Sequence, residues 1–451
     1  MAAVHPALAP RRARPSRRAS RPQVSTFNLA LKAICVVYLA LIVAGIIAYK
    51  AAFAHVVLTD PFFGIYSIAV CTFILSRFGF SLFYKPAEYA DMEPSVAVVM
   101  PAFNEEDAVA ASVRALFALD YPQDKLEVVV VNDGSTDGTL AAIESVAATE
   151  PRVRVIDFPE NRGKRAAMAA GIRATEAEII AFVDSDSMLD RDSVRTIVQG
   201  FGDPKVGAIA GHADVANVRE SWITRMQAVR YFVAFRVCKA AESLFGAVTC
   251  CSGCFSAYRR SAIAPSLDCW ENQRFLGRPA TYGDDRSLTN YVLRDWKVRY
   301  DSQATSRTIV PSHMMHFLRQ QLRWKRSWTR ESLIVARFMW RRNPLASLWT
   351  YLGILLPLVA PVVAARALAW HPLVDSSAAP IIYLGGIYAM ALVYGLYYGA
   401  RKGRYDTLWI FGVLFVFFYL ALLLWQTYYA ILTARNPSWG TRAAAPARAE
   451  A

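Results

Sequence analysis

Hydrophobic residues form two long blocks in this chain, and a middle region with short, separated apolar runs lies between them. The blocks cover about residues 27–84 and 345–432. A helix needs ~20 predominantly apolar residues to cross a membrane. Five segments are long enough: Phe27–Tyr49, Pro61–Tyr84, Leu345–Trp370, Ala379–Tyr398 and Leu408–Leu432. The pattern therefore predicts α-helical transmembrane segments on both sides of the middle region.

In the middle region the long apolar stretches give way to short runs rich in β-branched residues. The runs are Val96–Met100, Val128–Val131, Val153–Ile156, Ile179–Val183 and Val206–Ala210. Helix-like stretches separate them, which is the β-α-β order of a mostly parallel sheet with helices on both faces. Polar motifs follow successive runs, so we expect them to meet at one edge of the sheet, where α/β folds bind nucleotides.

These changes divide the chain into six segments. We expect a disordered basic N-terminus at 1–26, two transmembrane helices at 27–84, an α/β domain at 90–318, amphipathic interfacial helices at 319–343, a second transmembrane region at 344–432 and a cytoplasmic tail at 433–451. Residues 1–26 do not fit a signal peptide, because no clear small-residue cleavage site follows the apolar segment.

The formal net charge of +14 comes in part from basic residues that cluster beside the apolar blocks, and their positions predict how the chain is oriented in the membrane. Arginines between Arg11 and Arg21 precede the first block, and a cluster between Arg319 and Arg342 precedes the last. Basic residues beside spans favour the cytoplasmic side. Two crossings then place the middle domain in the cytoplasm of a multi-pass plasma-membrane protein. No nucleic-acid partner is expected, since the clusters adjoin hydrophobic blocks.

The three C-terminal apolar segments do not give a consistent orientation. Three full crossings would leave the tail outside, whereas a tail motif described below is expected inside. We therefore expect one of these segments to be re-entrant, interfacial or a broken helix pair. The segment with Pro357 and Pro361 and the aromatic last segment are both candidates.

Metal chemistry is indicated by acidic residues rather than by cysteines. Seven cysteines without a regular framework indicate reduced thiols. Cys251 and Cys254 have C-x-x-C spacing, but no second pair follows at a zinc-like distance. Asp184 and Asp186 directly follow a predicted strand, and two such carboxylates suit a hard cation, Mg²⁺ or Mn²⁺, shared with substrate phosphates. The alternative is a solvated turn that caps a helix.

Other loops carry candidate donor-binding residues. Asp133 follows the second run, where an acid can hydrogen-bond a nucleoside, although an ordinary Asp-Gly turn is the alternative. Lys164 and Arg165 suit a diphosphate, or else begin a solvated basic helix. After the first run, the donor-binding candidates are Pro101, Asn104 and Glu105.

Asp284 and Asp285 are the candidates for proton transfer. Sugar transfer needs a carboxylate that deprotonates the incoming hydroxyl; we assign Asp285 and keep Asp284 open, the alternative being a locally paired acidic loop. Gln320, Arg323 and Trp324 share one face if their segment is helical. An amide, a guanidinium and an indole suit a diphosphate beside a sugar ring. An interfacial amphipathic helix is a compatible alternative.

Together these motifs resemble those of processive membrane glycosyltransferases of family 2, over roughly residues 27–442. The family signature is an acid after the second strand, an Asp-x-Asp, a third acid and Gln-x-x-Arg-Trp. The corresponding residues are Asp133, Asp184/Asp186, Asp285 and Gln320/Arg323/Trp324. The resemblance implies a GT-A-like catalytic domain that binds UDP-sugars with a divalent metal and places Trp324 at the acceptor sugar.

Within this family the chain is most similar to hyaluronan synthases. The matching stretches are Glu271–Gly277, Gly283–Tyr291 and Asn343–Thr350. The tail sequence Trp439-Gly440-Thr441-Arg442 resembles their gating motif, which closes over the nucleotide from the cytoplasmic side. Trp439 and Arg442 are therefore expected at the donor site, with the tail inside.

One loop departs from this resemblance. Cys254-Phe255 stands where the hyaluronan synthases have Pro-Leu, and the double cysteine Cys250-Cys251 is similar to rhizobial chitooligosaccharide synthases. Ser252, Gly253 and Cys254 are expected to line the acceptor site. The departure therefore bears on the identity of the polymer.

The resemblance implies an inverting, processive synthase that makes hyaluronan from UDP-GlcNAc and UDP-glucuronate and secretes it through its own channel. It is expected to act as a monomer in contact with membrane lipids. A chitin or chitooligosaccharide synthase that uses UDP-GlcNAc alone is the alternative. Single-sugar transfer to a lipid carrier is disfavoured by the Gln-x-x-Arg-Trp. A transporter or scaffold with a silent nucleotide-binding domain is disfavoured by the intact acids.

Overall fold

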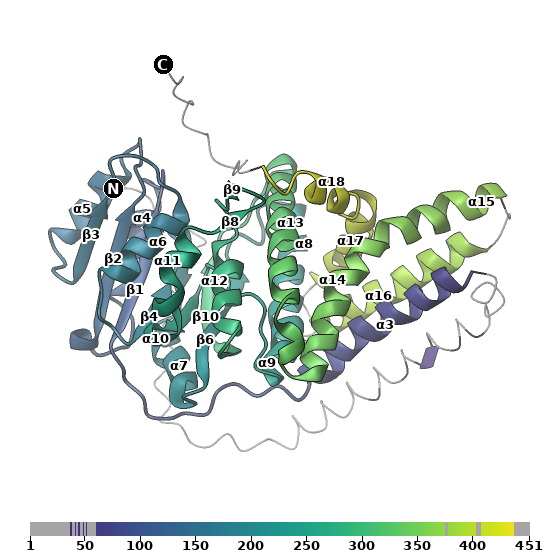
Figure 1. The fold of residues 1–451 in the computed structure, drawn as a ribbon, viewed down its shortest axis with the longest axis horizontal. Coiled ribbons are helices and arrows are strands. Elements are labelled where there is room, and N and C mark those ends of the chain that lie inside the picture. The colour runs from purple at the N-terminus through teal and green to yellow at the C-terminus, as the bar shows by residue number, and fades with distance from the viewer. Residues whose placement is uncertain are drawn as a thin grey trace.

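The structure is a computed structural model that describes residues 60–374, 378–402 and 407–436, with a few isolated positions between 37 and 51. The N-terminus at 1–26, nearly all of the first expected span and the tail motif therefore lie outside the described residues. The described chain forms an α/β domain at one end and a group of long helices at the other (Figure 1).

The α/β domain is built on an eight-stranded sheet with the order β3-β2-β1-β4-β7-β6-β10-β5. Its strands are β1 (Val96–Ala102), β2 (Leu126–Asn132), β3 (Val153–Asp157), β4 (Ile179–Phe182), β5 (Ser187–Leu189), β6 (Val206–Val215), β7 (Ser256–Arg259) and β10 (Lys297–Thr308). The β3-β2-β1-β4 and β6-β10 pairings are parallel, whereas β7 and β5 run antiparallel to their neighbours. The expected mostly parallel sheet is confirmed. A separate hairpin joins β8 (Arg274–Phe275) to β9 (Arg278–Pro279).

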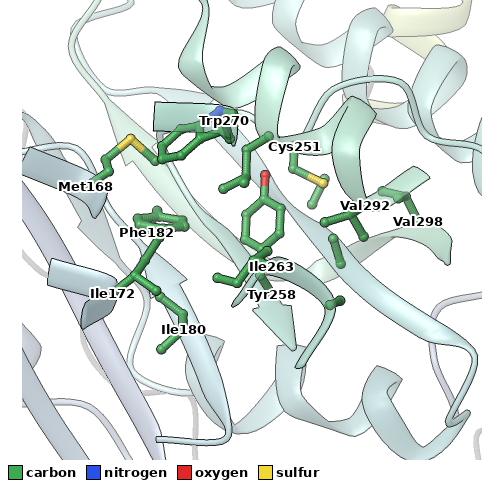
Figure 2. Packing of buried hydrophobic residues seen from close by; sticks show 14 of the residues in the cluster. Met168, Ile172, Ile180, Phe182, Cys251, Tyr258, Ile263, Trp270, Val292 and Val298 are labelled. Carbon is green, nitrogen blue, oxygen red and sulfur yellow. The ribbon is translucent and has the colours of Figure 1, made fainter. Parts of the chain in front are cut away.

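The sheet has a hydrophobic core on each face, because side chains alternate along a strand. In β1, Ala97 and Val99 enter one core, and Val96 and Val98 enter the other. The first core is covered by α6 (Lys164–Arg173), α10 (Arg260–Ile263), α11 (Leu267–Glu271) and α12 (Asp284–Leu293). The second is covered by α4 (Val109–Leu116), α5 (Thr139–Ala147) and α7 (Ser193–Gln199). Figure 2 shows the first core around Trp270.

Two long helical elements stand between the sheet and the remaining helices. One is a continuous run of α8 (Trp222–Val233), a π-helical turn (Ala234–Lys239) and α9 (Ala240–Leu244). The other is α13 (Met314–Ala336). Because both contact the sheet domain and the apolar helices, they position side chains between these two parts (Figure 1).

In the described part of the chain, three helices are long and apolar enough to cross a membrane: Pro61–Ser81, Pro344–Val374 and Ala379–Gly399. The first is α3 (Pro61–Ser81), the second joins α14 (Pro344–Ala365) to α15 (His371–Val374) through a π-helical turn, and the third lies in α16 (Ala379–Lys402). They extend away from the sheet together (Figure 1).

The last apolar segment is a bent helix pair. Its two parts, Trp409–Leu423 and Gln426–Leu432, meet at 46°; they comprise α17 (Trp409–Phe418) with a following π-helical turn, and α18 (Gln426–Leu432). α17 packs on α8 and α18 on α13. Beyond α18, the Tyr282 hydroxyl donates to the Asn436 carbonyl at 2.9 Å. The described chain thus ends beside the α/β domain. Of the two segments expected to contain a break, the aromatic last segment is the bent one, and the segment with Pro357 and Pro361 is not.

Candidate active site

A cavity of about 570 Å³ lies at the carboxyl ends of β1, β2 and β4, between the sheet and α13. Its wall contains most residues singled out from the sequence, namely Pro101, Asp133, Lys164, Asp184, Asp186, Ser252, Gly253, Cys254, Asp284, Asp285, Gln320, Arg323 and Trp324. Asn104, Glu105 and Arg165 do not contribute to the wall. Trp439 and Arg442 lie outside the described residues.

The Asp-x-Asp loop connects β4 to the short strand β5 and faces the cavity. The Asp184 amide donates to the Gly253 carbonyl at 3.0 Å, and the Lys164 ammonium pairs with the Asp184 carboxylate. A Cβ on Gly253 would lie 2.8 Å from Asp184 Oδ2. Glycine is therefore what lets the two loops approach each other here.

Asp184 and Asp186 offer only carboxylate oxygens, the donors that Mg²⁺ and Mn²⁺ prefer. Within the part of the chain that the structure describes, no group of three or more His, Cys, Asp or Glu side chains is gathered around one metal position. A cation on these acids would need its other ligands from substrate phosphate or water. The donor set therefore fits a metal shared with a bound diphosphate.

Asp133 is buried at the end of β2 and organises the neighbouring loop. Its Oδ1 accepts bonds from the Arg162 and Gly163 amides at 2.8 and 3.1 Å, and its Oδ2 accepts from Asn161 Nδ2 at 3.1 Å. These bonds fix the start of α6, which carries Lys164. Asp133 thus joins the end of β2 to the helix that carries Lys164.

Lys164 and Arg165 are adjacent in sequence but point to different places. Burial works against the charge of Lys164, yet Asp184, Asp284 and Asp285 raise the pKa of this ammonium above its ordinary value. Arg165 is 4% exposed and donates to Asp284, Trp270 and Gln273. Arg165 is therefore part of the domain interior, whereas Lys164 faces the cavity.

The two adjacent acids of α12 differ in the same way. Asp284 is 3% exposed, and its Oδ1 lies 2.8 Å from Arg165 Nε. Asp285 is less buried; its Oδ1 accepts from the Arg286 amide at 2.8 Å, and the Cys250 thiol lies 3.6 Å from its Oδ2. Among the described residues, no guanidinium or ammonium group is bonded to Asp285, whereas Arg165 is bonded to Asp284.

Gln320, Arg323 and Trp324 lie on α13 and face the cavity together. Arg230 of α8 lies over the Trp324 ring at 5.4 Å and donates to Gln321 Oε1 at 2.6 Å. The indole therefore has a cation on one side and the cavity beside it.

Sequence reasoning missed the cavity residues nearest the apolar helices. Arg230, Lys325, Tyr419 and Thr427 line this part, with Pro357 of α14. The Lys325 ammonium bonds the Leu423 carbonyl and donates to Thr427 Oγ1 at 2.8 Å. Burial and the nearby Arg230 charge lower the pKa of Lys325 to about 8. No motif spacing marks these residues, because four separate elements bring them together.

Asn104 and Glu105 have a supporting position beside the cavity. The Asn104 Oδ1 accepts a bond from the Thr136 amide at 2.9 Å, and the Glu105 amide donates to Thr139 Oγ1 at 2.7 Å. Asn104 also has a positive φ of 53°, which asparagine tolerates better than most residues. These contacts join the loop after β1 to the loop after β2.

Comparison with known proteins agrees with this geometry. The model described as glycosyl transferase family 2 matches residues 97–265. The chain is 32% identical over 387 residues to a hyaluronan synthase of Streptococcus pyogenes, which covers 84% of this chain and 90% of the relative. It is 34% identical over 362 residues to an N-acetylglucosaminyltransferase of Azorhizobium caulinodans, covering 78% and 88% of the two chains.

A solved structure supports the fold. The mannosyltransferase of Pyrobaculum calidifontis, solved in complex with GDP-Man and Mn²⁺, has a TM-score of 0.55 and 23% identity. The match covers 79% of this chain and 99% of that one. The α/β domain thus has a GT-A-like fold, and the chain belongs to glycosyltransferase family 2.

Proposed function

We propose that this protein is a processive, inverting glycosyltransferase that polymerises UDP-GlcNAc and UDP-glucuronate into hyaluronan and secretes it between its own membrane helices. One observation carries the proposal: a single cavity joins the acidic loops to the apolar helices. Its wall includes Asp184 and Asp285 near the sheet, and Pro357 and Tyr419 on the apolar elements. A growing chain has a route from the reacting sugars into the membrane region.

Asp285 is the general base of the proposed reaction. It accepts the proton of the acceptor hydroxyl while that oxygen attacks the anomeric carbon of the donor sugar. The bond from this carbon to the diphosphate oxygen breaks, and its electron pair leaves with UDP. Attack opposite the leaving group inverts the anomeric configuration. The pairing of Asp284 with Arg165 supports Asp285 rather than its neighbour in this role.

Other residues bind and orient the donor and acceptor. Asp184 and Asp186 would hold Mg²⁺ or Mn²⁺, which when bound neutralises charge on the departing diphosphate. Lys164, Gln320 and Arg323 bind the diphosphate, and Asp133 supports the nucleotide-binding loop. Trp324 contacts the acceptor sugar beside the loop Ser252–Cys254. Trp439 and Arg442 close the nucleotide site. Asn436, the last described residue, accepts a bond from the hydroxyl of Tyr282, which precedes α12.

The charge near the apolar helices favours a polymer that carries carboxylates. Arg230 and Lys325 line this part of the cavity, and neither forms an ion pair with an Asp or Glu of the described residues. Cations with no protein counter-ion attract an anionic ligand. Hyaluronan has a carboxylate on every second sugar, whereas chitin has none. The positions of these two side chains therefore favour the two-donor reaction.

Chitin-type synthesis from UDP-GlcNAc alone is the second candidate. The relative from Azorhizobium caulinodans is named an N-acetylglucosaminyltransferase, and Cys254 lies in the cavity wall at the position where the loop departs from hyaluronan synthases. In either case we propose a monomeric, multi-pass cell-membrane protein in contact with lipids, whose α/β domain faces the cytoplasm.

UDP release by the purified full-length protein in lipid nanodiscs tests the proposal. Each UDP-sugar is supplied singly and in pairs, with Mg²⁺ or Mn²⁺. We expect a large product only from UDP-GlcNAc with UDP-glucuronate, and its digestion by hyaluronidase. A chitinase-sensitive product from UDP-GlcNAc alone would establish the second candidate. No UDP release from any mixture would contradict both.

A further inference from the structure

The end of α3 nearest the α/β domain contacts the loop that faces the proposed base. Arg77 Nη1 of α3 lies 3.3 Å from Glu242 Oε1 of α9. Glu242 Oε2 accepts bonds from the Thr249 amide at 3.1 Å and the Thr249 hydroxyl at 3.4 Å. Glu242 therefore joins a helix long and apolar enough to span a membrane to the first residue of the loop 249–254, which we call the base loop.

The base loop in turn contacts Asp285 and the helix that carries it. The Cys250 thiol lies 3.6 Å from Asp285 Oδ2. The Cys251 amide donates to Thr289 Oγ1 at 2.9 Å, and this hydroxyl donates to the Asp285 carbonyl at 2.6 Å. A shift at Thr249 therefore acts on the carboxylate through Cys250 and on the first turn of α12 through Cys251.

Thr249 is bonded to Glu242 and borders a cavity. A second cavity of about 260 Å³ borders the base loop on this side, and Arg77, Glu242, Thr249 and Arg286 are part of its wall. A void provides no van der Waals contacts to the groups around it. The side chains of Arg77 and Glu242 are only 19% and 18% exposed, so water screens their attraction weakly.

We propose that Arg77 and Glu242 are positioning residues that orient Asp285, so that the placement of α3 sets the rate of sugar transfer. The inference rests on the proposed role of Asp285 as base. Most donor-binding groups, on Asp133, Lys164 and α13, lie on other elements. Among the described residues, the base loop contacts the donor side only at its far end, where the Gly253 carbonyl accepts from the Asp184 amide at 3.0 Å. The contact therefore affects kcat and leaves the donor KM nearly unchanged.

Substitutions at the two residues separate positioning from donor binding. In nanodiscs, Glu242→Gln and Arg77→Met should each lower kcat for UDP release about tenfold, since a misplacement of about 1 Å can cost about 100-fold and a smaller shift costs less. The KM for each donor should stay within about twofold. Arg77→Lys keeps the charge and should recover most of the kcat. The double variant should be no slower than Glu242→Gln, because both changes break one contact.

Two controls make the result decisive. Glu93→Gln removes a similar ion pair, with Arg195 at 2.6 Å on the other face of the sheet, and should leave kcat unchanged. Asp285→Asn tests the base itself: wild-type kcat in this variant would overturn the base assignment and the inference with it. If Asp285→Asn is inactive while Glu242→Gln and Arg77→Met keep wild-type kcat, only the inference is overturned. KM rising as much as kcat falls would also overturn it, since that indicates a general disturbance of the fold.

Discussion

Lys325 combines a largely buried position with a charge that the proposed product needs. Burial and the Arg230 charge lower the pKa of its ammonium to about 8. Below this pH the ammonium is charged and attracts a carboxylate; as the pH rises through the pKa, the attraction is lost. A bound carboxylate polymer favours the charged ammonium, so the pKa of Lys325 during synthesis lies at or above this value. We expect product length to fall between about pH 7 and about pH 9.5, measured by size-exclusion chromatography at equal UDP release.

Substitution of Lys325 separates this effect from other titrations. Lys325→Arg stays charged over the whole range, because the arginine pKa is above ~12, and its product length should stay constant. Lys325→Met should give short products at every pH. Products of wild-type length from Lys325→Met would show that this residue does not contact the polymer.

The pair Asp284 and Asp285 shows what the sequence can and cannot predict about a site. The residue types and the chemistry that sugar transfer needs are sufficient to select the pair. Their different surroundings come from Arg165, which lies 119 positions earlier and reaches Asp284 through the fold. The same limit applies to Arg165 itself, which looked like a second diphosphate ligand because its partner in the interior is remote in sequence.

At the scale of elements, α12 and α13 meet where only glycine fits. Gly283 has a φ of 75°, and a Cβ there would lie 1.8 Å from Ser327 Oγ and 2.6 Å from Ser327 Cβ. Gly283→Ala must displace α13, which carries Gln320 and Arg323, relative to the helix of Asp285. We expect UDP release to fall by at least about tenfold and Tm to decrease, measured by activity assay and thermal unfolding.

Gly277 offers a matched control for this contact. It also has a positive φ, 84°, but a Cβ there would meet no atom within 4 Å. Gly277→Ala should show only the cost of a left-handed backbone, roughly 1–2 kcal/mol, and keep its activity. Equal loss of activity in both variants would assign the effect to backbone strain instead of the helix contact.

Some strands can be predicted from their own sequence, and others depend on contacts with residues far away in the chain. β1, β2 and β4 are predictable because their sequences are almost entirely apolar, as central parallel strands are. β7 and β10 are not, since polar residues interrupt their apolar pattern. In β10, Ser306 is buried but donates to the His212 carbonyl at 3.0 Å, and Asp301 accepts from the Ala87 amide at 3.3 Å. Hydrophobic periodicity does not record such bonds, so polar buried strands go unrecognised.

At the scale of the whole molecule, the described apolar helices meet the α/β domain at the end of α3 and the start of α14, whereas the start of α3 lies beside α15 at their far end. α3 leads into the domain, and after the bent pair Arg435 donates to the Leu276 carbonyl at 2.9 Å. α14 leads away from the α/β domain and α16 leads back toward it, while α17 packs on α8 and α18 on α13. If α14 and α16 are one outward and one returning crossing and the bent pair does not cross, the end of the described chain lies on the same side as the α/β domain, as the proposed function requires.

Labelling of Cys269 can show on which side of the membrane the α/β domain lies. It is exposed on α11, whereas burial raises the pKa of Cys250 and Cys254 to about 12 and leaves almost no reactive thiolate at neutral pH. A membrane-impermeant maleimide should label Cys269 in inverted vesicles but not in intact cells, and Cys269→Ser should remove the signal. Labelling in intact cells that depends on Cys269 would place the catalytic domain outside. The nucleotide donors of the cytoplasm could not then reach the cavity, and the proposed direction of polymer export would be wrong.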